Sequence, residues 1–176
     1  MATTVEFART SRFDRVVTER VLAAATVVML VAVVAAVARG HTDWAAVPWP
    51  VWVHLATIAA ALALTPVMLL RRKGTRLHRV LGYVWTTAMV LTAGESLTFK
   101  TGAAPGSHGV FTGDISPIHI LSLVVLVMVP RLVLAARRHD IVAHRRGVRG
   151  IVIGAILIAG FFTFPFDRLL GRWLFA

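Results

Sequence analysis

Five apolar stretches divide the chain, and each is long enough to cross a lipid bilayer. They are residues 21–39, 50–70, 78–99, 117–136 and 146–170. A spanning helix needs about 20 mostly apolar residues, so each stretch predicts one transmembrane helix. Thr75 and Asp140 stand just before two of these helices, where a side-chain oxygen can cap the first turn. The pattern predicts an all-α integral membrane protein with five transmembrane helices.

The last four spans, at 50–170, predict an up-down four-helix core because alternate connections keep neighbouring helices antiparallel. The first span, 21–39, is too long for the core of a signal peptide and is predicted to be an additional retained helix. It follows a cytoplasmic N-terminal segment, 1–20, and the chain closes with a short outer tail, 171–176.

Composition supports a membrane protein and removes several kinds of chemistry. Of the 176 residues, 57% are hydrophobic and 15% are charged, and the mean hydropathy is +0.77. The net charge is +11, and the basic residues lie between the apolar spans, where they set the orientation in the membrane. This distribution does not indicate nucleic acid as a partner. The chain has no cysteine, which excludes disulfides, iron–sulfur clusters and covalently attached haem.

Basic residues alternate between the two sides of the predicted bundle. They precede the first span (Arg9, Arg12, Arg15, Arg20), join the second to the third (Arg71, Arg72, Lys73, Arg76, Arg79) and join the fourth to the fifth (Arg137, Arg138, Arg145, Arg146, Arg149). Cytoplasmic loops carry such an excess. The N-terminus is therefore predicted to be cytoplasmic and the C-terminus outside.

Four of the seven histidines lie in or near the first turn of consecutive predicted helices. His54 and His119 begin the second and fourth spans at the outer side, whereas His78 and His144 begin the third and fifth at the inner side. In an up-down bundle these pairs are diagonal, and two imidazoles can ligate one haem iron from both sides. The arrangement predicts two bis-histidine haem b groups, one above the other. The alternative is that each histidine is a solvated group at a helix end.

Small and cationic residues near the histidines extend this hypothesis. Gly82, Gly147 and Gly150 share a helix face with a histidine, where they would leave room for a haem or form a helix-packing seam. Arg79 and Arg145 would pair with haem propionates, unless they serve orientation alone.

Glu95 is the acidic residue near the outer end of the third span. An intramembrane carboxylate is a functional candidate, here as a proton or quinone site. With His54 and His119 it would also form a two-histidine, one-carboxylate set for a non-haem metal. Alternatively, it reaches interfacial water.

The chain resembles a known family over about residues 50–170. The stretches VHLATIAAALALTPVMLLRRKGTRLHRVLGYVW, SPIHILSLVVLV and AHRRGVRG are similar to an uncharacterised family of predicted bacterial membrane proteins. Its LHRxLG signature is matched at Leu77, His78, Arg79, Leu81 and Gly82. The resemblance implies a bacterial-type inner (plasma) membrane and carries no activity.

A more distant similarity is to the cytochrome b561 carriers, whose paired histidines hold two haems on a four-helix core. His54, His78, His119 and His144 follow the order of those ligands. The chain departs from the pattern in having five predicted spans and an alternating short and long spacing of histidines. The similarity implies a di-haem electron carrier.

We therefore expect transmembrane electron transfer through two haem b groups, with cytochrome-b-type oxidoreductase activity as one possibility. The expected partners are the lipid bilayer, quinol or another electron donor, and either a larger membrane complex or a second copy in a homodimer. Two alternatives stay open. One is a haem-free accessory subunit of a respiratory or photosynthetic complex that docks through 21–39. The other is the non-haem metal site.

Overall fold

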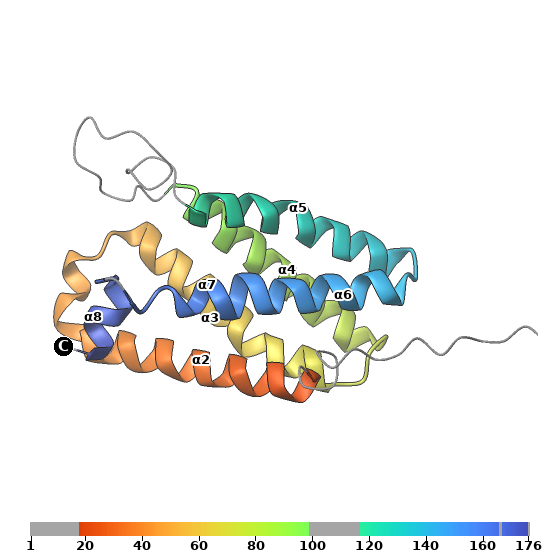
Figure 1. Cartoon of the computed structure of the whole chain (residues 1–176), viewed down its shortest axis with the longest axis horizontal. Helices are drawn as coiled ribbons and strands as arrows, with labels where there is room; N and C mark the ends of the chain where they lie inside the picture. Colours follow the sequence, from red (N-terminus) through yellow and green to blue (C-terminus); the bar gives the residue numbers. More distant parts are fainter. Residues whose placement is uncertain (1–17, 99–116, 166, 176) are drawn as a thin grey trace, which may run out of the picture.

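The regular structure of the chain is helical (Figure 1). The computed structural model describes residues 18–98, 117–165 and 167–175, and no strand occurs within these ranges. The long helices are α2 (Glu19–Arg39), α3 (Trp49–Leu70), α4 (Arg76–Ser96) and α5 (Pro117–Arg137). The last long run consists of α6 (Ile141–Ile151), the π-helical segment η2 (Val152–Ile158) and α7 (Ala159–Phe161), and the shorter helices are η1 (Gly40–Ala46) and α8 (Leu169–Phe175). The all-α prediction is confirmed.

Local sequence signals place the starts of α4 and α6. The Thr75 side chain accepts a hydrogen bond from the backbone N–H of His78 at 3.1 Å, and the Asp140 side chain accepts one from Ala143 at 2.9 Å. Each bond satisfies a backbone donor that the first helical turn leaves without a partner. Both predicted caps are confirmed, and they fix where His78 and His144 stand in their helices.

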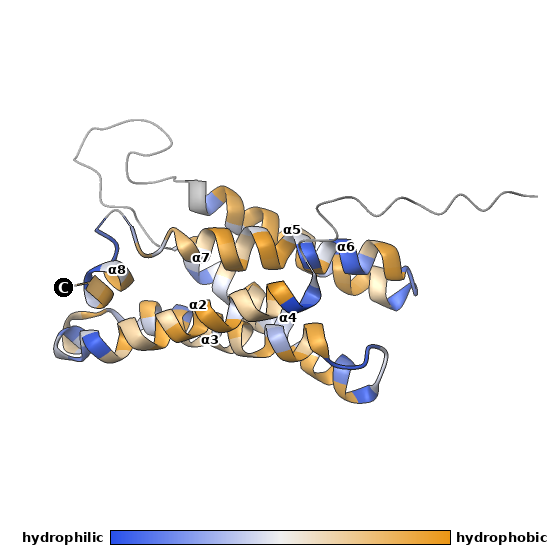
Figure 2. Ribbon diagram, turned by 60° about the horizontal axis from the view of Figure 1, so that its bottom comes forward, coloured by the Kyte–Doolittle hydropathy of each residue, from blue (hydrophilic) through white to orange (hydrophobic). Residues whose placement is uncertain are grey.

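Three helical stretches are long and apolar enough to cross a membrane by length and composition: Glu19–Ala46, Trp49–Leu70 and His119–Arg137. Among the described residues the other two predicted spans do not meet this measure. Threonines, glycines and Glu95 dilute the apolar content of α4, and the last run is divided into short segments with arginines in its first part. Figure 2 shows hydrophobic residues along the helices and hydrophilic residues gathered near their ends.

The C-terminal part of the chain differs from the expected span at 146–170 and tail at 171–176. The last long run begins at Ile141 and ends at Phe161, and α8 follows after a turn. The α8 residues Leu170 and Trp173 are buried, so this helix packs back onto α2. Apolar side chains at the chain end make the predicted tail part of the fold.

Helix α2 is one wall of the helical bundle. Helices adjacent in the chain pack against one another from α2 to α6, and η2 returns to α2 to close the ring. The α2 residues Thr26 and Ala36 are fully buried on its inner face. An apolar helix carries no outward sign of this role, because lipid and a neighbouring helix favour the same side chains.

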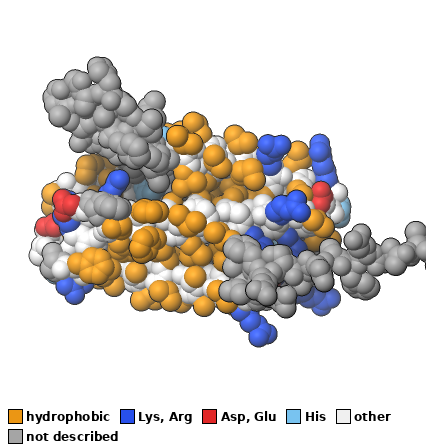
Figure 3. Space-filling model, in the orientation of Figure 1, with side chains coloured by type: hydrophobic (Ala, Val, Ile, Leu, Met, Phe, Trp, Pro, Cys, Tyr) orange, Lys and Arg blue, Asp and Glu red, His pale blue; other side chains and the backbone are white. Residues whose placement is uncertain are grey.

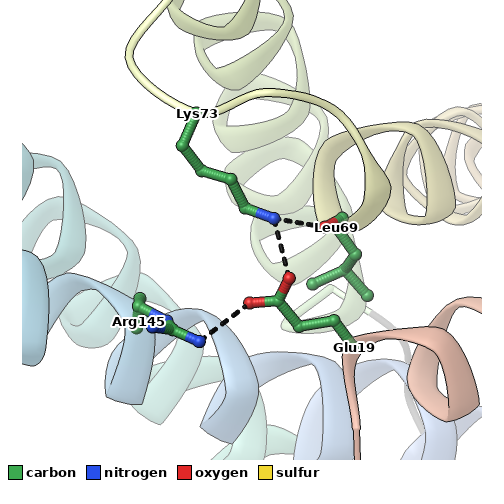
Figure 4. A network of polar contacts seen from close by, with 4 residues as sticks. All are labelled: Glu19, Leu69, Lys73 and Arg145. Atoms are coloured by element: carbon green, nitrogen blue, oxygen red, sulfur yellow. Dashed lines mark hydrogen bonds and ion pairs between the residues drawn. The ribbon is translucent and has the colours of Figure 1, made fainter.

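A three-residue ion-pair network joins α2 to two other parts of the bundle (Figure 4). Glu19 at the start of α2 pairs with Lys73 after α3 at 2.7 Å and with Arg145 of α6 at 3.2 Å. Lys73 also donates a hydrogen bond to the carbonyl of Leu69 near the end of α3. One carboxylate thus holds together three elements that are far apart in sequence.

At the opposite end, aromatic residues hold α8 against η1 and α3. The Trp173 ring stacks near Trp52 with centroids 6.3 Å apart, and its indole N–H donates to Asp43 at 3.0 Å. Gly40 lies directly under this ring, and a Cβ at this position would fall inside the indole of Trp173. The glycine is required here by close approach, since its own φ of −76° suits any residue.

Glu19→Gln is expected to lower the free energy of unfolding by about 1 kcal/mol or less, because both ion pairs are partly exposed and screened. The loss should shrink at high salt. Thermal unfolding in detergent at two salt concentrations measures it. Asp167→Asn, which removes the 3.6 Å pair with Arg172, is the matched control and should have a smaller effect. Equal effects would show that the network adds nothing beyond a surface pair.

Gly40→Ala is expected to destabilise the protein by about 1–3 kcal/mol, because the new methyl forces Trp173 and α8 to move. Gly94→Ala is the matched control, since no heavy atom lies within 4 Å of a Cβ there. Because Gly94 stands in the last turn of α4, that substitution should stabilise by no more than the about 0.5–1 kcal/mol typical of a helix interior. Denaturant-free thermal melts of both variants, followed by tryptophan fluorescence, measure the difference. A neutral Gly40→Ala would contradict the close packing of α8.

Candidate functional site

His78 and His144 lie near one another at the arginine-rich end of the bundle. Each occupies the first turn of its helix, is partly buried, and lies close enough for the charge of one to act on the other. His144 Nδ1 lies 3.0 Å from the backbone carbonyl oxygen of Leu132 in α5. His78 Nδ1 is buried and has no hydrogen-bond partner within the described ranges. The two rings therefore present nitrogen atoms that the surrounding helices do not use fully.

His54 and His119 lie toward the other end of the bundle, on α3 and α5. The His54 ring is partly buried and makes a hydrogen bond with the backbone of Thr92 in α4. His119 is only 8% exposed, although it stands in the first turn of α5. An imidazole this far from solvent must be satisfied by protein groups or by a ligand.

Hydroxyl groups connect α3, α4 and α5 near these two histidines. Thr92 of α4 donates to Thr57 of α3 at 2.8 Å, and Ser96 of α4 lies 2.6 Å from Ser122 of α5. Among these, Thr92, Ser96 and Ser122 are buried. We call these four residues the polar seam. Sequence reasoning missed it, although the spacing of four between Thr92 and Ser96 already puts two hydroxyls on one face of α4.

The polar seam fixes the relative depth of the outer histidines. His54 lies three residues before Thr57 on α3, and His119 lies three residues before Ser122 on α5, so each stands about one turn beyond its seam residue. The two seam contacts on α4 are one turn apart. His54 and His119 therefore differ in depth by about one helical turn, or ~5 Å.

Deeper in the bundle, a single aromatic hydrogen bond joins α3 to α4. The Trp85 indole N–H donates to Thr65 at 2.9 Å, and the Thr65 hydroxyl donates to the carbonyl of Ala61 at 2.7 Å. All three side chains are buried. The pair anchors the register of α3 against α4 between the two levels of histidines.

The predicted haem-floor glycines lie in different surroundings. A Cβ on Gly82 would meet the methyl of Met68 in α3 at 3.5 Å, and one on Gly147 would meet Leu132 Cβ in α5 at 3.2 Å. At Gly150 no heavy atom lies within 4 Å. Gly82 and Gly147 thus allow helices to approach, while Gly150 is exposed on the outside of α6.

The charged residues predicted to belong to the site lie in different environments. Arg145 pairs with Glu19, and Arg79 is exposed on α4. Glu95 is partly buried near the end of α4. The described part of the chain contains no group of three or more His, Cys, Asp or Glu side chains placed to hold a metal ion. His54, Glu95 and His119 are accordingly not assembled there as a three-ligand set.

Comparisons of the sequence and of the structure gave no match to a protein-family model, to a curated protein or to a solved structure.

Proposed function

We propose that this protein binds two haem b groups, one between His78 and His144 and one between His54 and His119, and transfers electrons across a membrane. The observation that carries the proposal is a contact between a histidine ring and the backbone of a neighbouring helix, which occurs in both pairs. His144 of the first pair and His54 of the second are each held by the backbone of the neighbouring helix. Haem, when bound, supplies reversible one-electron chemistry at its iron.

The backbone contacts suit the task of an iron ligand. A ligating histidine commonly donates one ring N–H to a carbonyl, which sets the tautomer and orients the ring. With Nδ1 of His144 donating to Leu132, the Nε2 atom is left as the ligating nitrogen. The N–H of Thr92 is used up by its own helix, whereas a helical carbonyl oxygen keeps a second lone pair. The Thr92 carbonyl is therefore the natural acceptor for the His54 ring N–H. Both rings would be oriented before the haem binds.

The surroundings of the inner pair support a bound group there. His78 Nδ1 is a buried polar atom without a partner in the described residues, which is costly unless a ligand or water satisfies it. The haem would enter by separating side chains at this end of the bundle, because Met68 and Leu132 already lie against Gly82 and Gly147.

The proposal includes five spans with the arginine-rich end in the cytoplasm of a bacterial-type cell. Helix α4 has 21 residues, or about 31 Å of helix, which equals the thickness of the hydrocarbon core. Lys and Arg gather at the end where α5 meets α6, and hydrophobic side chains cover the middle of the visible face (Figure 3). The α4 residues of the polar seam, Thr92 and Ser96, are tolerated in lipid because they face neighbouring helices.

A second candidate function is a haem-free accessory subunit of a larger membrane complex. The packing of Gly82 and Gly147 against other helices favours it, since both glycines are explained without a cofactor. Exposed valines on α2, including Val28 at 69% and Val31 at 61%, would then face a partner helix and not lipid.

Haem content distinguishes these functions. Protein made in haem-replete cells should contain about two haems per chain, and His144→Ala should leave about one, because only the inner iron loses a ligand. The reduced-minus-oxidised absorption spectrum and a haem assay measure this. His41→Ala is the control and should keep both, since His41 hydrogen-bonds within its own segment. Protein without haem after haem addition would contradict the haem proposal and favour the accessory-subunit function.

Orientation is tested with introduced cysteines, because the chain has none of its own. Ala45→Cys in η1 and Ala143→Cys in α6 replace exposed residues at opposite ends. An impermeant thiol reagent added to intact cells should label Ala45→Cys alone, and both variants after the cells are opened. Labelling of Ala143→Cys alone in intact cells would reverse the proposed topology.

A further inference from the structure

A groove of about 540 Å³ runs along the outside of the bundle between α4 and α5. Tyr83, Thr87 and Leu91 form part of its α4 wall, and Val133 and Leu134 form part of its α5 wall. Tyr83 and Leu91 are eight residues apart on α4, so the groove follows about 12 Å of helix. Its shape is that of a channel parallel to the helix axes.

The groove exists because both walls present modest side chains above a buried floor. Val129, which lies at its base, is 2% exposed, and Pro130 follows it within α5. On α4 the threonines are shorter than the side chains that flank them. The Thr86 hydroxyl donates to the carbonyl of Tyr83 at 3.0 Å, so it needs no partner from an occupant. The lining is thus effectively apolar along most of its length.

One end of the groove is polar and positively charged. Arg137, the last residue of α5, donates to the Tyr83 hydroxyl at 3.4 Å. Arg79 lies one turn before Tyr83 on α4, so a second cation stands near this end. No acidic residue occurs among the described residues that line the groove. A ligand that fits must therefore combine a long apolar chain with an anionic group.

We propose that this groove holds one acyl chain of an anionic phospholipid, with Arg137 at the phosphate. A guanidinium presents two parallel donors that match phosphate oxygens, and Tyr83 already holds this one at the groove's mouth. The inner leaflet supplies such lipids at the arginine-rich side of a membrane protein. The lipid site rests on the groove, on Arg137 and on the orientation included in the proposed function, and it stands whether or not the histidines bind haem.

The test counts lipids retained by the purified full-length protein. Detergent-solubilised protein is mixed with phosphatidylglycerol or phosphatidylcholine of the same chains and examined by native mass spectrometry. One phosphatidylglycerol should be retained about fivefold better than phosphatidylcholine, as one arginine contact contributes. Arg137→Gln should abolish this preference, whereas Arg138→Gln, a neighbouring cation outside the lining, should keep it.

A second variant tests the groove itself. Thr87→Trp fills the channel and should reduce retention of both lipids, and Val28→Trp on the exposed face of α2 is its matched control. If Thr87→Trp does not fold, Leu91→Trp fills the same channel and serves as the replacement variant. Equal retention of the two lipids by the unsubstituted protein would overturn the proposal. So would equal losses in Arg137→Gln and Arg138→Gln, or a neutral isoprenoid retained in place of phospholipid.

Discussion

Every buried hydroxyl and indole of a membrane bundle has to be satisfied by protein groups, because lipid provides no hydrogen-bond partner, and in this bundle several of those partners lie on a neighbouring helix. That constraint determines how α3, α4 and α5 slide along one another. The pairs Thr92–Thr57, Ser96–Ser122 and Trp85–Thr65 each match a position on one helix with a position on its neighbour. A shift by one residue would break them together, so the depth of the histidines follows from the hydroxyls.

Glycine positions show a second consequence of packing without a hydrophobic driving force. Helices in lipid associate through close contact, and small residues permit it. Gly147 brings α6 close to Leu132 of α5, and the same approach allows His144 to reach the Leu132 carbonyl. The residue expected to make room for a cofactor thus also places a proposed ligand. Gly147 can serve both helix packing and haem binding, provided that α6 does not have to separate fully from α5 to admit the haem.

Local signals predicted much of the fold, and long-range contacts were beyond them. The helical class and the caps at Thr75 and Asp140 follow from patterns within a few residues. The polar seam could not be predicted in this way, because the spacing of hydroxyls on one helix does not show which neighbouring helix they contact. Gly40 likewise gave no sign of Trp173, which lies far along the chain. The role of α2 in closing the bundle was hidden because all of its faces are apolar.

The contacts of Glu19 imply an order of assembly. Its carboxylate reaches Lys73, 54 residues later, and Arg145, 126 residues later. During synthesis the first partner emerges well before the second, so α2 and α3 can associate while the remaining helices are still being made. The ring of helices then stays open until α6 supplies the second cation and η2 packs against α2. Completion of the ring is therefore a late event, and a chain truncated before α6 would expose the inner face of α2 to lipid.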